Sequence, residues 1–175
     1  MYKLFITAMV ISAVVFSCKP KPPSPKDILF QDITKLQKDP DLIYSDTLFN
    51  SYHRYITLYP TDPKCAHYLL LSADIAGRRQ RSNDASLLYE QYANTYKDSA
   101  EAGEALFLAA SLKEKMNDHE ESKRIFSQYL VFYPDGPRNA EIRQIIPFLG
   151  LTGEQLIEVF RIPEVPDSTK VKNFK

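Results

Sequence analysis

The chain has 175 residues, enough for one domain with a continuous core, and its 22 Lys and Arg residues balance its 22 Asp and Glu residues. A formal net charge of zero gives no basic surface of the kind that nucleic-acid-binding proteins need. The sequence has only five glycines and two cysteines, which argues against glycine-rich catalytic loops and against a disulfide framework.

The first 17 residues have the pattern of an export signal. Lys3 supplies a positive start, and residues 4–16 form an uncharged, mostly apolar run that is too short to span a bilayer comfortably. The run ends in Ser17-Cys18, which resembles the lipobox of bacterial lipoproteins, although that family prefers Leu and a small residue at the two positions before Ser17. The resemblance implies that Cys18 begins the mature protein and carries acyl chains such as palmitate. Ordinary signal-peptidase cleavage after Ser17 is the alternative.

Residues 18–26 are expected to form a tether between the lipid and the folded part. Lys19 to Lys26 contain four prolines in eight residues, which excludes a helix and favours an extended polyproline-type segment. At ~3.1 Å per residue, this segment places the first helix about 25 Å from the lipid surface. Lys19 directly after Cys18 argues, by the same resemblance, against retention in the inner membrane. We therefore expect a lipid-anchored protein of the outer membrane that faces the periplasm.

Residues 27–160 contain an internal repeat with a spacing of 37 residues. Tyr55, Tyr92 and Tyr129 mark three copies that align without a gap, and an aromatic residue stands three positions before each. Within each copy, apolar residues recur with the period of an α-helix. The unit is therefore predicted to be a pair of antiparallel helices, which must stack on neighbouring pairs to bury its apolar face.

The repeat resembles the tetratricopeptide (TPR) family, in which helices A and B of each unit stack into a superhelix. The resemblance covers roughly residues 46–149 and rests on small or aromatic residues at the family's packing positions: Ala73, Ala85, Tyr89, Ala110, Ser122 and Phe126. Pro134 matches the family's closing proline, whereas Lys97 does not, and Tyr92 and Tyr129 stand where the family usually has alanine. The resemblance implies an all-α, antiparallel helix-pair solenoid with about two complete repeats, flanking half repeats and capping helices.

We expect eight helices, at residues 27–38, 46–59, 64–79, 83–96, 100–116, 119–133, 138–146 and 152–160. The pairs Asn83-Asp84 and Asn117-Asp118 are expected to cap the helices that they open. Cys65 is expected to be a small residue at a helix start, with a reactive thiol as the alternative. Residues 161–175 are polar and contain proline, so we expect a mobile tail, with a strap as the alternative.

The sequence offers no residue pattern typical of an enzyme or a metal site. The three histidines, at positions 53, 67 and 119, form no i, i+4 pair, and no second cysteine is left to complete a metal site. We predict no enzyme, no metal and no cofactor other than the lipid on Cys18. The acidic run from Asp118 to Glu121 fits a helix N-terminus. The basic run from Arg78 to Arg81 fits a solvated helix end, with docking of an acidic partner as the alternative.

The resemblance further implies a concave surface formed by the A helices, which holds a peptide or a partner helix. The family's groove positions fall on two rows of residues: His67, Leu70, Asp74 and Arg78 in one unit, and Glu104, Phe107, Ser111 and Lys115 in the next. Core packing is the alternative for Leu70 and Phe107.

The first functional hypothesis is a membrane-anchored scaffold for protein–protein interactions in the bacterial cell envelope, similar to repeat proteins of outer-membrane assembly or of the Tol system. Its partners would be an envelope protein or peptide and the membrane itself, with no nucleic acid. The second hypothesis is a cell-wall or glycan-binding module. It requires aromatic side chains that are exposed in the groove instead of buried between repeats.

Overall fold

A computed structural model describes residues 21–161, so the expected signal peptide, the lipidation site Cys18 and nearly all of the expected tail lie outside the described residues. The described part is all-α and contains no β-strand. Its helices are α2 Pro25–Lys38, α3 Asp46–Leu58, α4 Lys64–Arg78, α5 Ser82–Thr95, α6 Ala102–Lys115, α7 His119–Phe132, α8 Asn139–Ile145, the 3-10 helix η1 Ile146–Phe148 and α9 Gly153–Phe160. The all-α prediction is confirmed, and each expected helix is present with its ends within two residues.

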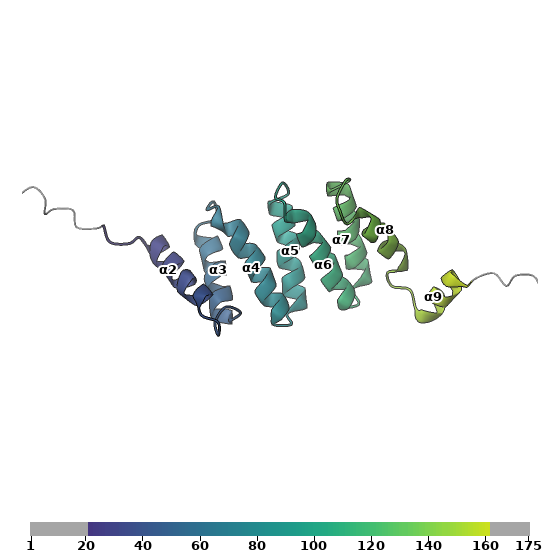
Figure 1. The fold of residues 1–175 in the computed structure, drawn as a ribbon, viewed down its shortest axis with the longest axis horizontal. Helices are drawn as coiled ribbons and strands as arrows, with labels where there is room; N and C mark the ends of the chain where they lie inside the picture. The colour runs from purple at the N-terminus through teal and green to yellow at the C-terminus, as the bar shows by residue number, and fades with distance from the viewer. Residues whose placement is uncertain (1–20, 162–175) are drawn as a thin grey trace, which may run out of the picture.

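The helices follow one another along the long axis of the molecule, with α2 and α9 at opposite ends (Figure 1). Each helix from α2 to α7 packs on the next one in sequence, and this packing is most extensive among α4, α5, α6 and α7. The contact between α7 and α8 is smaller, and α9 packs extensively on no other helix of the described chain. None of the helices in residues 21–161 is long and apolar enough to span a membrane.

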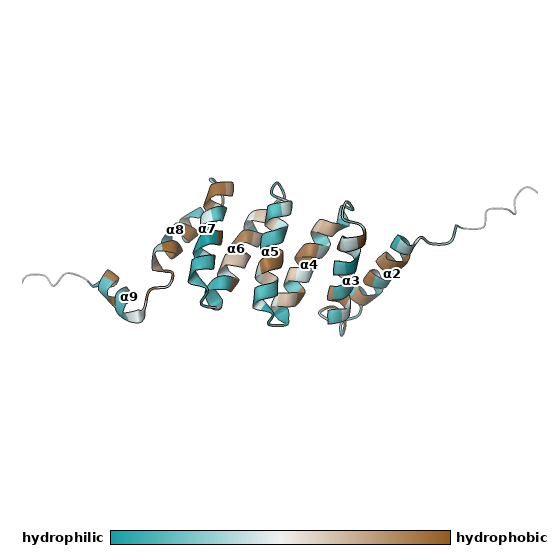
Figure 2. Ribbon diagram, turned by 180° about the vertical axis from the view of Figure 1, so that it is seen from behind, coloured by the Kyte–Doolittle hydropathy of each residue, from teal (hydrophilic) through white to brown (hydrophobic). Residues whose placement is uncertain are grey.

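The core consists of two groups of buried side chains, a smaller one across α2, α3 and α4 and a larger one from α4 to α8. Tyrosines fill much of it: the rings of Tyr52 and Tyr68 stack at 4.8 Å, and Tyr55 meets Tyr68 edge-on at 5.0 Å. Figure 2 shows hydrophilic residues along most of α7 and more apolar residues on α6 and α8. Each such ring buries roughly 150–250 Å² of surface, so the tyrosines contribute strongly to packing between helices.

A buried tyrosine near the end of α3, α5 and α7 bonds to the connection that follows the helix. The Tyr55 hydroxyl donates to the Asp62 carboxylate at 3.0 Å, and the Tyr92 and Ser99 hydroxyls lie 2.9 Å apart. Asp62, Ser99 and Gly136 are spaced by 37 residues, and their backbone N–H groups make the same 2.9 Å bonds, to the carbonyls of Tyr59, Tyr96 and Tyr133. Gly136 has no side chain that could bond to Tyr129. In this connection the backbone N–H of Arg138 donates to the Tyr129 hydroxyl instead, at 3.2 Å.

The connections after α4 and α6 reverse the chain through a different backbone arrangement. Gln80 and Asn117 adopt left-handed backbone conformations, with φ of 59° and 60°. Directly after them, the N–H groups of Arg81 and Asp118 donate to carbonyls five residues earlier, both at 2.9 Å, which is the Schellman arrangement.

The expected Asn-Asp caps are therefore wrong in detail. Arg81 and Asp118 occupy the N-cap positions of α5 and α7, and neither helix has a side-chain cap bond. Asn83 lies inside α5 and accepts a hydrogen bond from Lys113 at 2.9 Å. Asn117 lies in the turn itself, because asparagine tolerates the left-handed region better than most residues.

Candidate partner-binding surface

The two rows predicted from the sequence lie on α4 and α6, and the spacing of three and four residues within each row places its members on one face of the helix. All eight side chains are exposed or half-buried. Leu70 and Phe107 also pack against the larger core group, so the core-packing alternative accounts for part of each side chain. The rows therefore present charged groups around two half-buried apolar side chains.

The α4 row borders a cavity of about 330 Å³. His67, Asp74 and Arg78 line it on α4, whereas Leu70 does not. Its other side is formed by Gln37 at the end of α2 and by Tyr44 in the connection between α2 and α3. The sequence analysis predicted neither residue. Gln37 stands 37 residues before Asp74, so the repeat spacing could have given it, whereas Tyr44 lies in a connection that is longer than those after α4 and α6.

Hydrogen bonds and a stacked cation fix the side chains around this cavity. The Arg78 guanidinium lies over the Tyr44 ring, 4.4 Å from its centroid. The Asp74 carboxylate accepts a 2.5 Å hydrogen bond from Tyr89, and Gln37 donates to the Tyr52 hydroxyl at 2.9 Å. Burial, and then the bond to Asp74, raise the pKa of Tyr89, so this hydroxyl stays protonated. A ligand here therefore meets one cation and one carboxylate already held in place.

Arg138, which precedes α8, contacts two residues of the α6 row. Arg138 donates two hydrogen bonds to the Glu104 carboxylate, at 2.8 and 3.1 Å, and its guanidinium lies 4.4 Å from the centroid of the Phe107 ring. The hydrogen bond to Glu104 is the main reason that the pKa of Arg138 is raised. Ser111 donates to the backbone carbonyl of Phe107 at 2.8 Å, and Lys115 is exposed. Phe107 is thus an apolar surface that Arg138 covers on one side.

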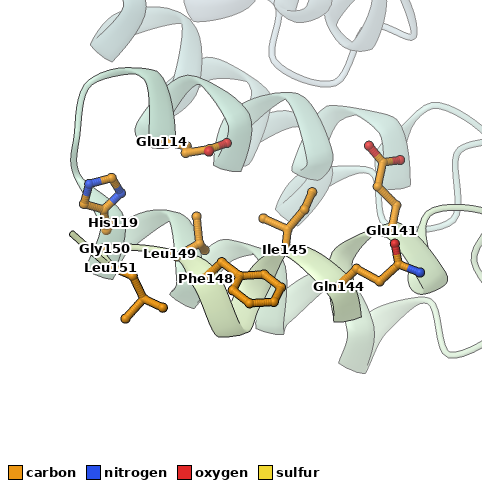
Figure 3. A pocket seen from close by; sticks show the side chains of 9 residues that line it. All are labelled: Glu114, His119, Glu141, Gln144, Ile145, Phe148, Leu149, Gly150 and Leu151. Carbon is orange, nitrogen blue, oxygen red and sulfur yellow. The ribbon is translucent and has the colours of Figure 1, made fainter. Parts of the chain in front are cut away.

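A third row, missed by the sequence reasoning, lies on α8. Glu141, Gln144 and Phe148 stand 37 residues after Glu104, Phe107 and Ser111. All three line a cavity of about 550 Å³, and Figure 3 shows them along α8 and η1 with Glu114 and His119 across from Leu149. The repeat spacing alone identifies these positions, so the signal was present in the sequence.

Among residues 21–161, no group of three or more His, Cys, Asp or Glu side chains could hold a metal ion. Cys65 is buried at the start of α4, as expected from the sequence, and its thiol lies 3.1 Å from the Tyr59 carbonyl oxygen. Burial raises the pKa of the Cys65 thiol, which keeps it protonated.

The basic run at the end of α4 divides between two environments. Arg79 forms an ion pair with Asp46 at 2.8 Å, and Arg81 lies 3.7 Å from the same carboxylate. Arg78 instead points to the cavity beside Tyr44. Only Arg78 of these three thus belongs to the candidate surface.

Comparison with protein-family models, with curated proteins and with solved structures finds no match for this chain. Functional inference therefore rests on the surface geometry and on the sequence pattern.

Proposed function

We propose that the chain is a lipid-anchored adaptor of the bacterial cell envelope, built as a TPR-like solenoid of helix pairs, that binds a peptide or helix of another protein. The observation that carries this proposal is which side chains are buried in the core and which remain at the surface. Most tyrosines are buried between successive helices, whereas the rows on α4 and α6 remain at the surface with charged and apolar groups side by side.

Three structural features support the solenoid part of the proposal. Consecutive helices pack on each other, and α5 and α7 begin 37 residues apart. The backbone hydrogen bonds in the connections after α3, α5 and α7 recur with the same spacing. An array in which each unit contacts mainly its neighbours is the general plan of repeat proteins. Under this proposal α2, α4, α6 and α8 are the A helices.

The chemistry of the rows favours an amphipathic protein segment as ligand. Leu70 and Phe107 occupy the same place in successive units and offer half-buried apolar contacts. Charges of both signs come from Asp74 and Arg78 on one helix and from Glu104 and Lys115 on the next, and they fix the orientation of a bound segment. Such recognition needs no catalytic residue.

The distribution of aromatic side chains favours this hypothesis over a glycan-binding module. Six tyrosines that the repeat pattern places in α3, α4, α5 and α7 are buried: Tyr52, Tyr55, Tyr68, Tyr89, Tyr92 and Tyr129. At the α4 cavity the exposed ring is that of Tyr44, and Arg78 already stacks on it. A glycan platform would need free aromatic faces, so protein recognition is the better-supported function.

Membrane attachment is proposed on the sequence pattern around Cys18, with the protein on the outer membrane and facing the periplasm. Because Figure 1 places α2 at one end of the array, a tether attached there would hold the rows away from the bilayer. Substitution of Cys18→Ala is expected to abolish acylation, measured by mass spectrometry, and to release the protein from the membrane fraction. Retention of the variant in the membrane would contradict the anchor.

Charge reversal on the rows tests partner binding. The full chain carrying Arg78→Glu and Lys115→Glu is compared with wild type and with a control carrying Arg54→Glu and Lys123→Glu, whose exposed residues lie on α3 and α7. All three proteins are recovered from cross-linked cells, and the envelope proteins that accompany them are quantified. We expect partners to be lost from the row variant and kept by the control. Equal recovery from both variants would reject this surface.

A further inference from the structure

The C-terminal end of the array carries a groove and, next to it, a helix with an uncovered apolar face. The groove is the 550 Å³ cavity of Figure 3, which we call the C-terminal groove. Its apolar lining is formed by Ile145, Phe148, Leu149 and Leu151, opposite Glu114 and His119. The helix is α9, in which the exposed fractions of Ile157, Val159 and Phe160 are 68%, 56% and 66%.

The sequence of α9 matches the buried faces of α5 and α7. Counted from the first residue of each helix, positions four, seven and eight are Ala85, Leu88 and Tyr89 in α5, and Ser122, Ile125 and Phe126 in α7. All six are buried against neighbouring helices. The same positions in α9 are Leu156, Val159 and Phe160. Leu156 is half-buried, but Val159 and Phe160 are exposed, so α9 has the residues of a packed helix while most of this face stays open.

The connection before α9 explains why its own chain leaves this face open. Gly150 has a φ of 80°, as a turn residue should, but the N–H of Leu151 donates to Phe148, only three residues back. The five-residue bonds that fold α5 and α7 back are made by Arg81 and Asp118. The equivalent bond is absent here, and within residues 21–161 α9 packs extensively on no other helix, although the rings of Phe148 and Phe160 stack at 5.3 Å.

The helix is nevertheless well formed at its start. Thr152 and Gln155 make a reciprocal capping box, in which the Thr152 N–H donates to the Gln155 side chain at 2.8 Å and the Gln155 N–H donates to the Thr152 hydroxyl at 3.3 Å. A capped helix on a four-residue connection can dock as a unit. The groove and the helix also lie at the same end of one chain, so two copies related by a two-fold axis can satisfy each other reciprocally.

We propose that the protein forms a two-fold dimer in which α9 of each copy enters the C-terminal groove of the other and packs Leu156, Val159 and Phe160 against it. This interface lies at the end of the array opposite α2 (Figure 1). It does not depend on the rows of α4 and α6. The α2 end of each copy, where the proposed anchor attaches, lies outside this interface.

Site-specific disulfide formation tests the exchange. In α6 and α7 the rings of Phe107 and Phe126 lie 5.6 Å apart. Their counterparts in the dimer are position 144 of one copy and position 160 of the other, so position 159, which adjoins 160, is expected to lie close to position 144. Two differently tagged full-length chains are co-expressed, one with Gln144→Cys and one with Val159→Cys. Leu87→Cys replaces Val159→Cys in the control, because Leu87 has a similar exposed fraction of 52% on α5.

We expect a mixed dimer linked through positions 144 and 159, about tenfold more abundant than with the control and reduced to the control level by Phe160→Asp. In addition, the unsubstituted full chain should sediment at twice its monomer mass. A link that forms only within one chain carrying both cysteines would show that α9 closes on its own groove and would overturn the proposal. A monomeric sedimentation mass would overturn it as well.

Discussion

The Tyr55 hydroxyl donates a hydrogen bond to the Asp62 carboxylate and thereby ties the end of α3 to the connection that leads into α4. The same carboxylate accepts from the backbone N–H of Lys64 at 2.8 Å and forms an ion pair with Lys26 of α2. Only 6% of the Asp62 side chain is exposed. One residue of a connection therefore joins three helices at the N-terminal end of the array.

The ionisation of Asp62 predicts a loss of stability in acid. The hydrogen bond to Lys26, followed by that to the Lys64 N–H, lowers the pKa of Asp62 to about 2 from 3.8. A lowered folded-state pKa contributes stability above the unfolded-state value, and this contribution is lost as the pH falls from about 4 to about 2. We expect Asp62→Asn to be less stable than wild type at pH 6, with the difference shrinking towards pH 2. Urea unfolding at several pH values measures it, and a constant difference would contradict the assignment.

Gly136 is predicted to resist substitution because of its contact with Tyr129. A Cβ at position 136 would lie 2.6 Å from the Tyr129 hydroxyl and 2.9 Å from the backbone carbonyl of Tyr133. Gly136→Ala should therefore destabilise the protein by about 1–3 kcal/mol, the usual range for overpacking. Gly153→Ala is the control, because a Cβ there meets nothing within 4 Å. Equal unfolding free energies for the two variants would be inconsistent with the packing described.

The hydrogen bonds between Tyr92 and the connection after α5 predict that removal of the Tyr92 hydroxyl lowers stability. This side chain is buried, and its hydroxyl contacts Ser99 at 2.9 Å and Glu101 at 3.3 Å. Removing it in Tyr92→Phe should lower the unfolding free energy by about 1 kcal/mol, because Ser99 loses its partner. Tyr68→Phe, an equally buried ring with no hydrogen bond from its hydroxyl to any described residue, should change stability less. Thermal unfolding of both variants provides the comparison.

Gln80 is predicted to be a site where glycine stabilises. Its φ of 59° lies in the left-handed region, which costs a residue with a Cβ roughly 1 kcal/mol. Gln80→Gly should raise the unfolding free energy by up to about 1 kcal/mol. Asn50→Gly, at an exposed position inside α3, should instead lower it by about 0.3 kcal/mol, because glycine is a poorer helix former than asparagine. If both changes destabilise equally, the turn geometry at Gln80 is not the one described.

The helical part of the fold could be predicted because its signals are local. The spacing of Tyr55, Tyr92 and Tyr129 indicated where the helices of each repeat lie, and the predicted helix ends agree with the structure to within two residues. Capping was mispredicted because asparagine suits both an N-cap and a left-handed turn, and the sequence does not distinguish these uses at Asn117. Gln80 in the equivalent turn carries no such signal.

The candidate surface was only partly predictable. The rows on α4 and α6 follow from the repeat spacing, and the same spacing would also have given Gln37 on α2, Gln144 on α8 and Phe148 on η1. Tyr44 could not be found this way, because it belongs to a connection outside the repeat and reaches Arg78 only through tertiary packing. In the connection before α9 the Leu151 N–H donates to a carbonyl only three residues back, and no residue pattern indicates this difference from the turns before α5 and α7.

Photo-crosslinking in cells tests the proposed partner surface most directly. A photoreactive residue is placed at position 67 on α4, at position 115 on α6, or at position 87 on α5 as a control, since all three native side chains are exposed. The adaptor account predicts that positions 67 and 115 capture the same envelope protein, that position 87 does not, and that Cys18→Ala lowers the yield. Capture from position 87 alone, or of unrelated proteins from positions 67 and 115, would contradict it.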